Sequence, residues 1–190
     1  MNRKLKTVLC AALVLLLMFS CCCVSFADEP MPLTVKAKAA VLMDVDSGKV
    51  LMSMNADEKL YPASVTKIMT LLLVTEALDS GKISLSDTVT ASASAASKGG
   101  SQIGLKEPEQ MTVDDLLKAT AVYSANDACT ALGELLAGSN EAFTAMINER
   151  AGQLGMKNTH FDNCTGLDDT TTTHLTTAMD VAIMSRELLK

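Results

Sequence analysis

Tryptophan is absent from this 190-residue sequence, and only two tyrosines and four phenylalanines are present. Because aromatic side chains are so few, leucine, valine, alanine and methionine must fill most of any hydrophobic core. An excess of basic residues is also lacking, since 22 acidic side chains outnumber 16 lysines and arginines. The resulting net charge of −6 argues against a nucleic-acid-binding protein.

Cysteine is scarce outside the beginning of the chain. Four of the six cysteines lie within the first 27 residues, at Cys10, Cys21, Cys22 and Cys23. The remaining two, Cys129 and Cys164, form neither a disulfide framework nor a zinc-binding pattern. Cys129 falls in a helical pattern, so we predict a small buried side chain there and no bridge to Cys164.

The first 27 residues have the features of a secretory signal peptide. Three cations (Arg3, Lys4 and Lys6) precede an apolar stretch that ends at the small-x-small sequence Ser25-Phe26-Ala27. We expect cleavage after Ala27, an extracytoplasmic location, and a single domain over residues 28–190. Two alternatives remain, an uncleaved membrane anchor and a lipoprotein modified at Cys21.

The rest of the chain predicts a hairpin followed by several helices. Apolar runs on both sides of Asp46-Ser47-Gly48 predict a β-hairpin over residues 39–54. An almost uniformly apolar segment, 64–79, predicts a central buried helix. Turn-forming residues over 83–110 predict surface loops with short extended pieces at most. Further helices are expected to start after Thr112, at Asn126, near Asn140 and near Thr177.

A short motif at the start of the predicted central helix has unusual chemistry. Ser64-Val65-Thr66-Lys67 is the one S-x-x-K sequence in the chain, and it places a cation in the first helical turn. The helix dipole and apolar surroundings disfavour that charge, so Lys67 requires either solvent exposure or a function. Both effects lower the pKa of a lysine, and a neutral amine three residues from a serine can accept its proton.

An S-x-N sequence occurs twice, at Ser53-Met54-Asn55 and at Ser124-Ala125-Asn126. The first copy lies in the predicted hairpin, so the second is the better candidate for a site. Ser124 and Asn126 can also be explained as capping residues of the following helix.

Two extended stretches around these motifs resemble D-alanyl-D-alanine carboxypeptidases, the low-molecular-mass penicillin-binding proteins. They are "AAVLMDVDSGKVLMSMNADEKLYPASVTKIMTLLL" and the segment from "GGSQIGLKEPEQMTVDDLLKATAVYSANDACTALG" to "MKNTHFDNCTGL". The resemblance runs from about Lys38 to Lys190. It implies an α+β fold of the β-lactamase/DD-peptidase type, in which helices flank an antiparallel sheet.

The resemblance also implies an acyl-serine mechanism on peptidoglycan stem peptides that end in D-Ala-D-Ala, and acylation by β-lactam antibiotics. Ser64 matches the nucleophile of the family, Lys67 its base and Ser124 its proton relay. Asn126 matches a substrate-binding residue, and Ser101 lies in a loop that resembles one bordering the family's site, where a solvated turn is equally expected. No metal and no cofactor are implied, and His160 and His174 are expected to be structural or surface residues.

One family motif has no counterpart in the sequence. The family carries K-T-G or a near variant on a later strand, and no such triplet occurs here. We therefore expect this sequence to be the N-terminal part of a carboxypeptidase domain, truncated before the C-terminal strands. Activity of this part by itself is not predicted. Membrane association of a full-length protein is implied by the family analogy alone.

Two other functions are considered. A class A β-lactamase shares the first two motifs but uses a glutamate in E-x-x-x-N, whereas "NTHFDN" follows the carboxypeptidase pattern. A non-catalytic extracytoplasmic protein that binds penicillin or the cell wall would retain the nucleophile without turnover.

Overall fold

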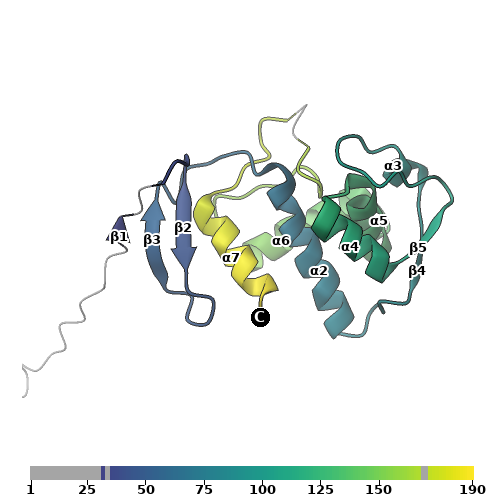
Figure 1. Ribbon diagram of the computed structural model, residues 1–190, viewed down its shortest axis with the longest axis horizontal. Helices are drawn as coiled ribbons and strands as arrows, with labels where there is room; N and C mark the ends of the chain where they lie inside the picture. Colours follow the sequence, from purple (N-terminus) through teal and green to yellow (C-terminus); the bar gives the residue numbers. More distant parts are fainter. Residues whose placement is uncertain (1–30, 33–34, 168–170) are drawn as a thin grey trace, which may run out of the picture.

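The helix α2 (Lys67–Asp79) lies at the centre of the molecule. The computed structural model describes residues 31–32, 35–167 and 171–190, so the predicted signal peptide lies outside the described residues. Four helices contact α2: α4 (Val113–Tyr123), α5 (Asn126–Ala137), α6 (Asn140–Gln153) and α7 (Ala178–Leu188). Figure 1 shows α7 between α2 and the larger sheet, with α4 and α5 on the opposite side of α2. The predicted central helix is confirmed.

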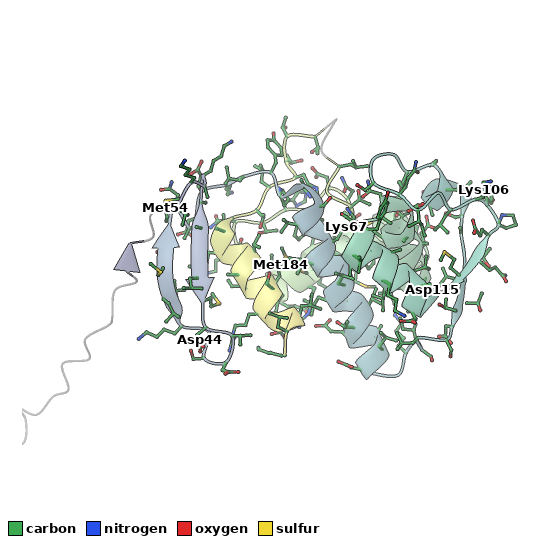
Figure 2. The ribbon with its side chains drawn as sticks, in the orientation of Figure 1. Asp44, Met54, Lys67, Lys106, Asp115 and Met184 are labelled. Atoms are coloured by element: carbon green, nitrogen blue, oxygen red, sulfur yellow. The ribbon has the colours of Figure 1, made fainter. Side chains whose placement is uncertain are left out.

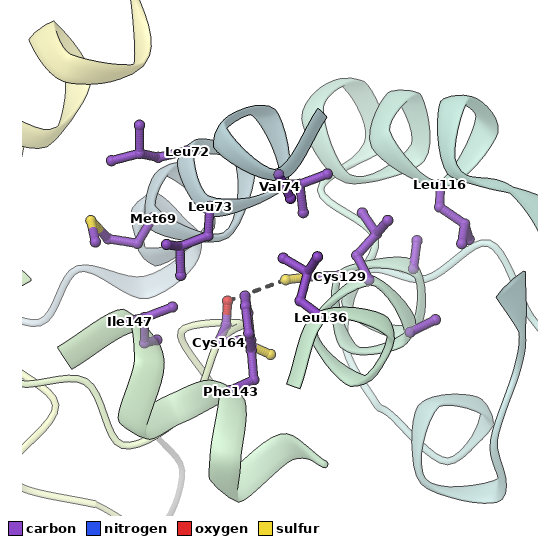
Figure 3. Packing of buried hydrophobic residues seen from close by; sticks show 14 of the residues in the cluster. Met69, Leu72, Leu73, Val74, Leu116, Cys129, Leu136, Phe143, Ile147 and Cys164 are labelled. Carbon is purple, nitrogen blue, oxygen red and sulfur yellow. Dashed lines mark hydrogen bonds between the residues drawn. The ribbon is translucent and has the colours of Figure 1, made fainter. Parts of the chain in front are cut away.

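The core is built around α2 because this helix is apolar on nearly every side. Figure 3 shows Met69, Leu72, Leu73 and Val74 of α2 packed among residues of the neighbouring helices. Leucine, valine, alanine and methionine supply most of the buried apolar side chains, as predicted. Two of the four phenylalanines, Phe143 and Phe161, are also completely buried. The few aromatic residues therefore contribute more to the core than their number suggests.

The larger sheet contains the predicted hairpin. Its strands are β1 (Met31–Pro32), β2 (Ala40–Met43) and β3 (Val50–Met54), in the order β1-β3-β2. The pairing of β2 with β3 is antiparallel, whereas β1 lies parallel to β3. Asp44 closes the hairpin turn by accepting a hydrogen bond from the Ser47 backbone N–H at 2.9 Å. The short strand β1, which was not predicted, extends the hairpin to three strands.

The region predicted to be loop contains short regular elements. They are β4 (Thr88–Thr90), α3 (Ala93–Ala96) and β5 (Gln110–Thr112), and β4 pairs with β5 in a second sheet. The predicted helix starts are confirmed, because the hydroxyls of Thr112, Ser139 and Thr177 each accept a backbone N–H bond at an N-cap. In the described part of the chain, none of the helices combines the length and apolarity needed to cross a membrane.

Candidate active site

Ser64 lies on a 3-10 turn, η1 (Ala63–Thr66), that leads directly into α2. The N-cap of α2 is Thr66 and not Ser64, and no side-chain capping bond is present there. Ser64 is exposed, whereas Lys67 at the first position of α2 is only 3% exposed. The helix therefore starts later than the sequence predicted, and the serine hydroxyl is left free of a capping role.

The Lys67 amine connects Ser64 to a distant segment of the chain. Its Nζ atom donates hydrogen bonds to Ser64 Oγ at 3.2 Å and to the Thr165 carbonyl at 2.8 Å. Burial lowers the pKa of Lys67 below its ordinary value of 10.5, although the nearby Cys129 and Cys164 act in the opposite direction. Figure 2 locates Lys67 on the central helix. This arrangement favours a neutral amine beside an accessible hydroxyl, as a nucleophile and its base require.

A structured turn over residues 162–167 presents the Thr165 carbonyl to Lys67. Asn163 Oδ1 accepts bonds from Thr165 N at 3.0 Å, Thr165 Oγ1 at 3.0 Å and Gly166 N at 2.7 Å. Its Nδ2 donates to the Leu167 carbonyl at 2.7 Å. Asn163 was not among the residues predicted from the sequence to belong to a site. Asn163 and Gly166 are turn-forming residue types that would have indicated the turn, but not its contact with Lys67.

Gly166 allows this turn to pack directly against Ser64. It has φ +85°, and a Cβ atom there would lie 1.8 Å from the Ala63 carbonyl oxygen and 3.0 Å from Ser64 N. Ala63 itself has φ +45°, an unfavourable value for a residue with a side chain. Backbone strain of this kind is often found where surrounding contacts determine the geometry of a functional site.

The Ser124-Ala125-Asn126 segment forms the sharp corner between α4 and α5. Ser124 has left-handed backbone angles, φ 58° and ψ 33°, and Ala125 is the N-cap of α5 without any side-chain capping bond. The capping explanation for Ser124 and Asn126 is therefore wrong. Within residues 35–167 and 171–190, no hydrogen bond joins Ser124 to Ser64 or Lys67.

Asn126 is buried against the loop that contains Ser101. Its Nδ2 donates to the Gly99 carbonyl at 2.7 Å, and its backbone N–H donates to the Ser101 carbonyl at 2.7 Å. Its Oδ1 is buried without a hydrogen-bond partner. The contact from Ser101 is thus made by its backbone. A Cβ atom on Gly100 would lie 2.9 Å from Asn126 Nδ2 and 3.5 Å from the Leu167 side chain, so the loop and the turn 162–167 meet at this glycine.

Asp127 fixes the continuation of the same loop. Its fully buried carboxylate accepts bonds from the backbone N–H groups of Ile103 at 3.2 Å, Gly104 at 2.9 Å and Leu105 at 3.0 Å. A fourth bond comes from Ala128 N at 2.9 Å. Asp127 was not predicted from the sequence to be a site residue. An acidic residue in the first turn of a helix has an ordinary explanation in the helix dipole, so its sequence position is not distinctive.

The two histidines lie where structural and surface residues were expected. His160 is largely exposed, with its Nε2 3.1 Å from Asp162 Oδ1. His174 is fully buried and accepts the Asp162 backbone N–H at its Nδ1, at 3.0 Å. Because Nδ1 is an acceptor, Nε2 carries the ring proton and donates it to Thr66 Oγ1 at 2.8 Å. The neutral ring therefore ties η1 to the start of the turn 162–167.

The site can be compared with known proteins. Residues 25–190 match the family described as D-alanyl-D-alanine carboxypeptidase. The D-alanyl-D-alanine carboxypeptidase DacF of Bacillus subtilis is 48% identical over 190 residues, which cover 100% of this chain and 48% of DacF. The chain thus spans about half the length of this curated relative.

Solved structures of penicillin-binding proteins are also similar to this chain. Penicillin binding protein 6B from Escherichia coli has a TM-score of 0.79 and 37% identity, over 86% of this chain and 52% of that protein. Penicillin-Binding Protein D2 from Listeria monocytogenes, in its ampicillin-bound form, has a TM-score of 0.72 and 31% identity. That match covers 85% of this chain and 64% of the Listeria protein. The expected α+β fold of the DD-peptidase type is confirmed.

Proposed function

Because this chain belongs to the D-alanyl-D-alanine carboxypeptidase family, we propose that it contains the nucleophile of a serine-type D-Ala-D-Ala carboxypeptidase. The observation that supports this proposal most directly is the 3.2 Å contact between Lys67 Nζ and Ser64 Oγ. Burial lowers the pKa of Lys67, so the amine can accept a proton at a pH where an exposed lysine could not.

The proposed reaction begins with attack of Ser64 Oγ on the carbonyl between two terminal D-alanines. Lys67 Nζ takes the hydroxyl proton while the carbonyl oxygen becomes negatively charged. The Ser64 backbone N–H, at the turn before α2, is proposed as one donor to this oxyanion. Collapse of the intermediate expels D-alanine, whose nitrogen receives a proton through Lys67 and Ser124. Water then hydrolyses the acyl-serine and restores the free hydroxyl.

Asn126 is proposed to bind the substrate peptide. Its Nδ2 is held by the Gly99 carbonyl, which fixes the orientation of the amide group and leaves Oδ1 without a partner. That oxygen suits an N–H group of an extended peptide, because an unpaired buried acceptor gains most from a new donor. Ser101 is a weaker candidate for the same role, since its contact with Asn126 uses its backbone carbonyl.

The proposed substrates are peptidoglycan stem peptides that end in D-Ala-D-Ala, and β-lactams are proposed to acylate the same serine. The ampicillin-bound form of the related Listeria protein supports the second part. Action on such peptides requires an extracytoplasmic protein, which agrees with the predicted signal peptide. Peripheral membrane association belongs to the same proposal for the full-length protein.

A fluorescent penicillin tests the nucleophile. We expect stoichiometric labelling of the purified protein at Ser64, loss of labelling in Ser64→Ala, and unchanged labelling in Ser86→Ala, whose serine lies exposed in a distant loop. Labelling that persists in Ser64→Ala would reject Ser64 as the nucleophile. Release of D-alanine from a tripeptide ending in D-Ala-D-Ala then separates a carboxypeptidase from a non-catalytic penicillin-binding protein, which would be labelled but release no D-alanine.

A further inference from the structure

Two thiols lie side by side behind the candidate active site. Cys129 on α5 is fully buried, and Cys164 in the turn 162–167 is 3% exposed. Cys129 Sγ donates to the Cys164 carbonyl at 3.2 Å and lies 3.5 Å from Thr70 Oγ1 on α2. Figure 3 shows the first of these bonds. Both cysteines are free in the structure.

The two thiols differ in acidity. Burial raises the pKa of Cys129 well above its ordinary value. The pKa of Cys164 is lowered, first by the hydrogen bond from Cys129, and the positive charge of Lys98 acts in the same direction. Cys164 also lines a pocket, whereas Cys129 is fully buried, so Cys164 is the better source of a thiolate and Cys129 would react second.

Cys164 can be approached from a pocket that does not include Ser64 or Lys67. This pocket has a volume of about 410 Å³, and Cys164 lines it together with Lys98, Glu141 and Asp162. Two carboxylates and one amine make its wall slightly acidic, which favours a small uncharged reagent over an anionic one.

We propose that Cys129 and Cys164 form a redox-active pair that closes to a disulfide with a small disulfide oxidant. The Cys164 thiolate attacks one sulfur of the oxidant, forms a mixed disulfide and releases one thiol. Cys129, losing its proton, then attacks Cys164 Sγ and expels the second thiol. Two protein thiols are thus oxidised, and one external disulfide is reduced to two thiols.

Closure would act on the catalytic lysine through the turn 162–167. A disulfide holds its sulfurs about 2.05 Å apart, closer than two unbonded sulfur atoms can lie, and so draws Cys164 toward α5. The next carbonyl, that of Thr165, accepts the Lys67 amine at 2.8 Å, and the next residue, Gly166, has no free space beside Ala63. This step rests on the proposed function: we expect the disulfide to lower the rate of acylation at Ser64 by about tenfold to a hundredfold.

Peptide mapping tests bond formation without reference to activity. Purified protein is treated with 2-hydroxyethyl disulfide, remaining thiols are alkylated, and the digest is analysed by mass spectrometry. We expect a peptide containing a Cys129–Cys164 link that disappears after dithiothreitol, and a stable mixed disulfide at Cys164 in Cys129→Ala. A mixed disulfide that persists in the wild type, or no reaction at either thiol, would overturn the proposal.

Penicillin labelling tests the consequence for the active site. The oxidised protein and the same sample after reduction are compared for their acylation rates at Ser64, and the reduced sample should be faster. Equal rates with a fully formed disulfide would reject control of Lys67 by the pair. Absence of acylation in both samples would instead reject the proposed function, while the peptide map still decides whether the disulfide forms.

Discussion

Lys67 combines a favourable position for chemistry with an unfavourable one for a charge. Its amine is buried at the N-terminal end of a helix, where both desolvation and the helix dipole oppose protonation. Two acceptors, Ser64 Oγ and the Thr165 carbonyl, hold the amine in place. At the scale of a single residue, the fold therefore gives up stability to keep a buried amine beside the serine.

This conflict predicts a pH-dependent stability difference between the wild type and Lys67→Met. The pKa of Lys67 in the folded protein lies below 10.5, so between these two values the unfolded chain binds a proton that the folded chain does not. The free energy of unfolding of the wild type, relative to Lys67→Met, should therefore rise with pH over this window and level off below it. Urea unfolding at a series of pH values measures the difference. A difference that falls with rising pH would contradict a lowered pKa.

The same substitution should slow penicillin acylation by about a thousandfold, because a general base is lost. In the wild type, acylation should rise as the pH increases through the lowered pKa of Lys67, since the neutral amine is the reactive form. Lys157→Met, which removes an exposed lysine, serves as the control and should leave acylation unchanged.

Sequence spacing alone could predict a contact only where both residues are close in the chain. Ser64 and Lys67 are three residues apart, and their contact follows from that local spacing. Asp127 and Asn163 could not be found because Asp127 binds backbone groups more than 20 residues away and Asn163 acts through the Thr165 carbonyl. Likewise, His174 contacts Thr66 across 108 residues. Such partners depend on the tertiary fold.

At the scale of the elements, two clamps assemble the site around α2. One is the Asp127 carboxylate at the start of α5, which accepts backbone hydrogen bonds from residues 103–105 of the neighbouring loop. The other is the turn 162–167, which packs against η1 at Gly166. Each clamp depends on a single residue, Asp127 or Gly166, so each can be tested by one substitution.

Asp127→Asn should release the loop from α5. The amide replaces one acceptor oxygen with a donor that faces backbone N–H groups, and each unpaired buried group is costly. We expect a loss of about 2–3 kcal/mol in the free energy of unfolding and weaker penicillin labelling, because the loop also carries the partners of Asn126. Asp79→Asn, at the exposed end of α2, is the matched control. Equal effects of both variants would reject the clamp.

Gly166→Ala should separate the turn 162–167 from η1. The new methyl group would overlap the Ala63 carbonyl, and φ +85° is itself unfavourable for alanine. We expect a loss of about 2–4 kcal/mol and a strong decrease in acylation, measured by thermal unfolding and penicillin labelling. In Gly152→Ala, the added Cβ meets nothing within 4 Å on helix α6, so stability should be unchanged or slightly higher. Wild-type stability in Gly166→Ala would show that the turn can move at little cost.

The elements themselves could largely be predicted, because local chemistry determines where they start. The hairpin turn at Asp44–Lys49 and the capping hydroxyls of Thr112, Ser139 and Thr177 are features of adjacent residues. The pairing of β4 with β5 was missed because each strand has three residues and the partner lies about 20 residues away. The 3-10 start of α2 was missed because its strain depends on the packing of Gly166.

At the scale of the whole molecule, the predicted signal peptide leads us to expect an extracytoplasmic protein. Secretion from a bacterial host should yield a mature chain that begins at Asp28, as determined by N-terminal sequencing or intact mass. Ala27→Leu should impair cleavage, because the processing enzyme requires a small residue at this position. A mature chain that begins at a lipid-modified Cys21 would instead establish the lipoprotein alternative, and an unprocessed chain the membrane anchor.

The neutral His174 ring joins Thr66, one residue before Lys67, to the turn that accepts the Lys67 amine. Its buried Nε2 proton is shielded from water and held at 2.8 Å from a hydroxyl, conditions under which exchange with solvent is slow. This single imidazole proton therefore supplies a natural nuclear magnetic resonance reporter of the active site. Its resonance can be followed during acylation without attaching a label to the protein.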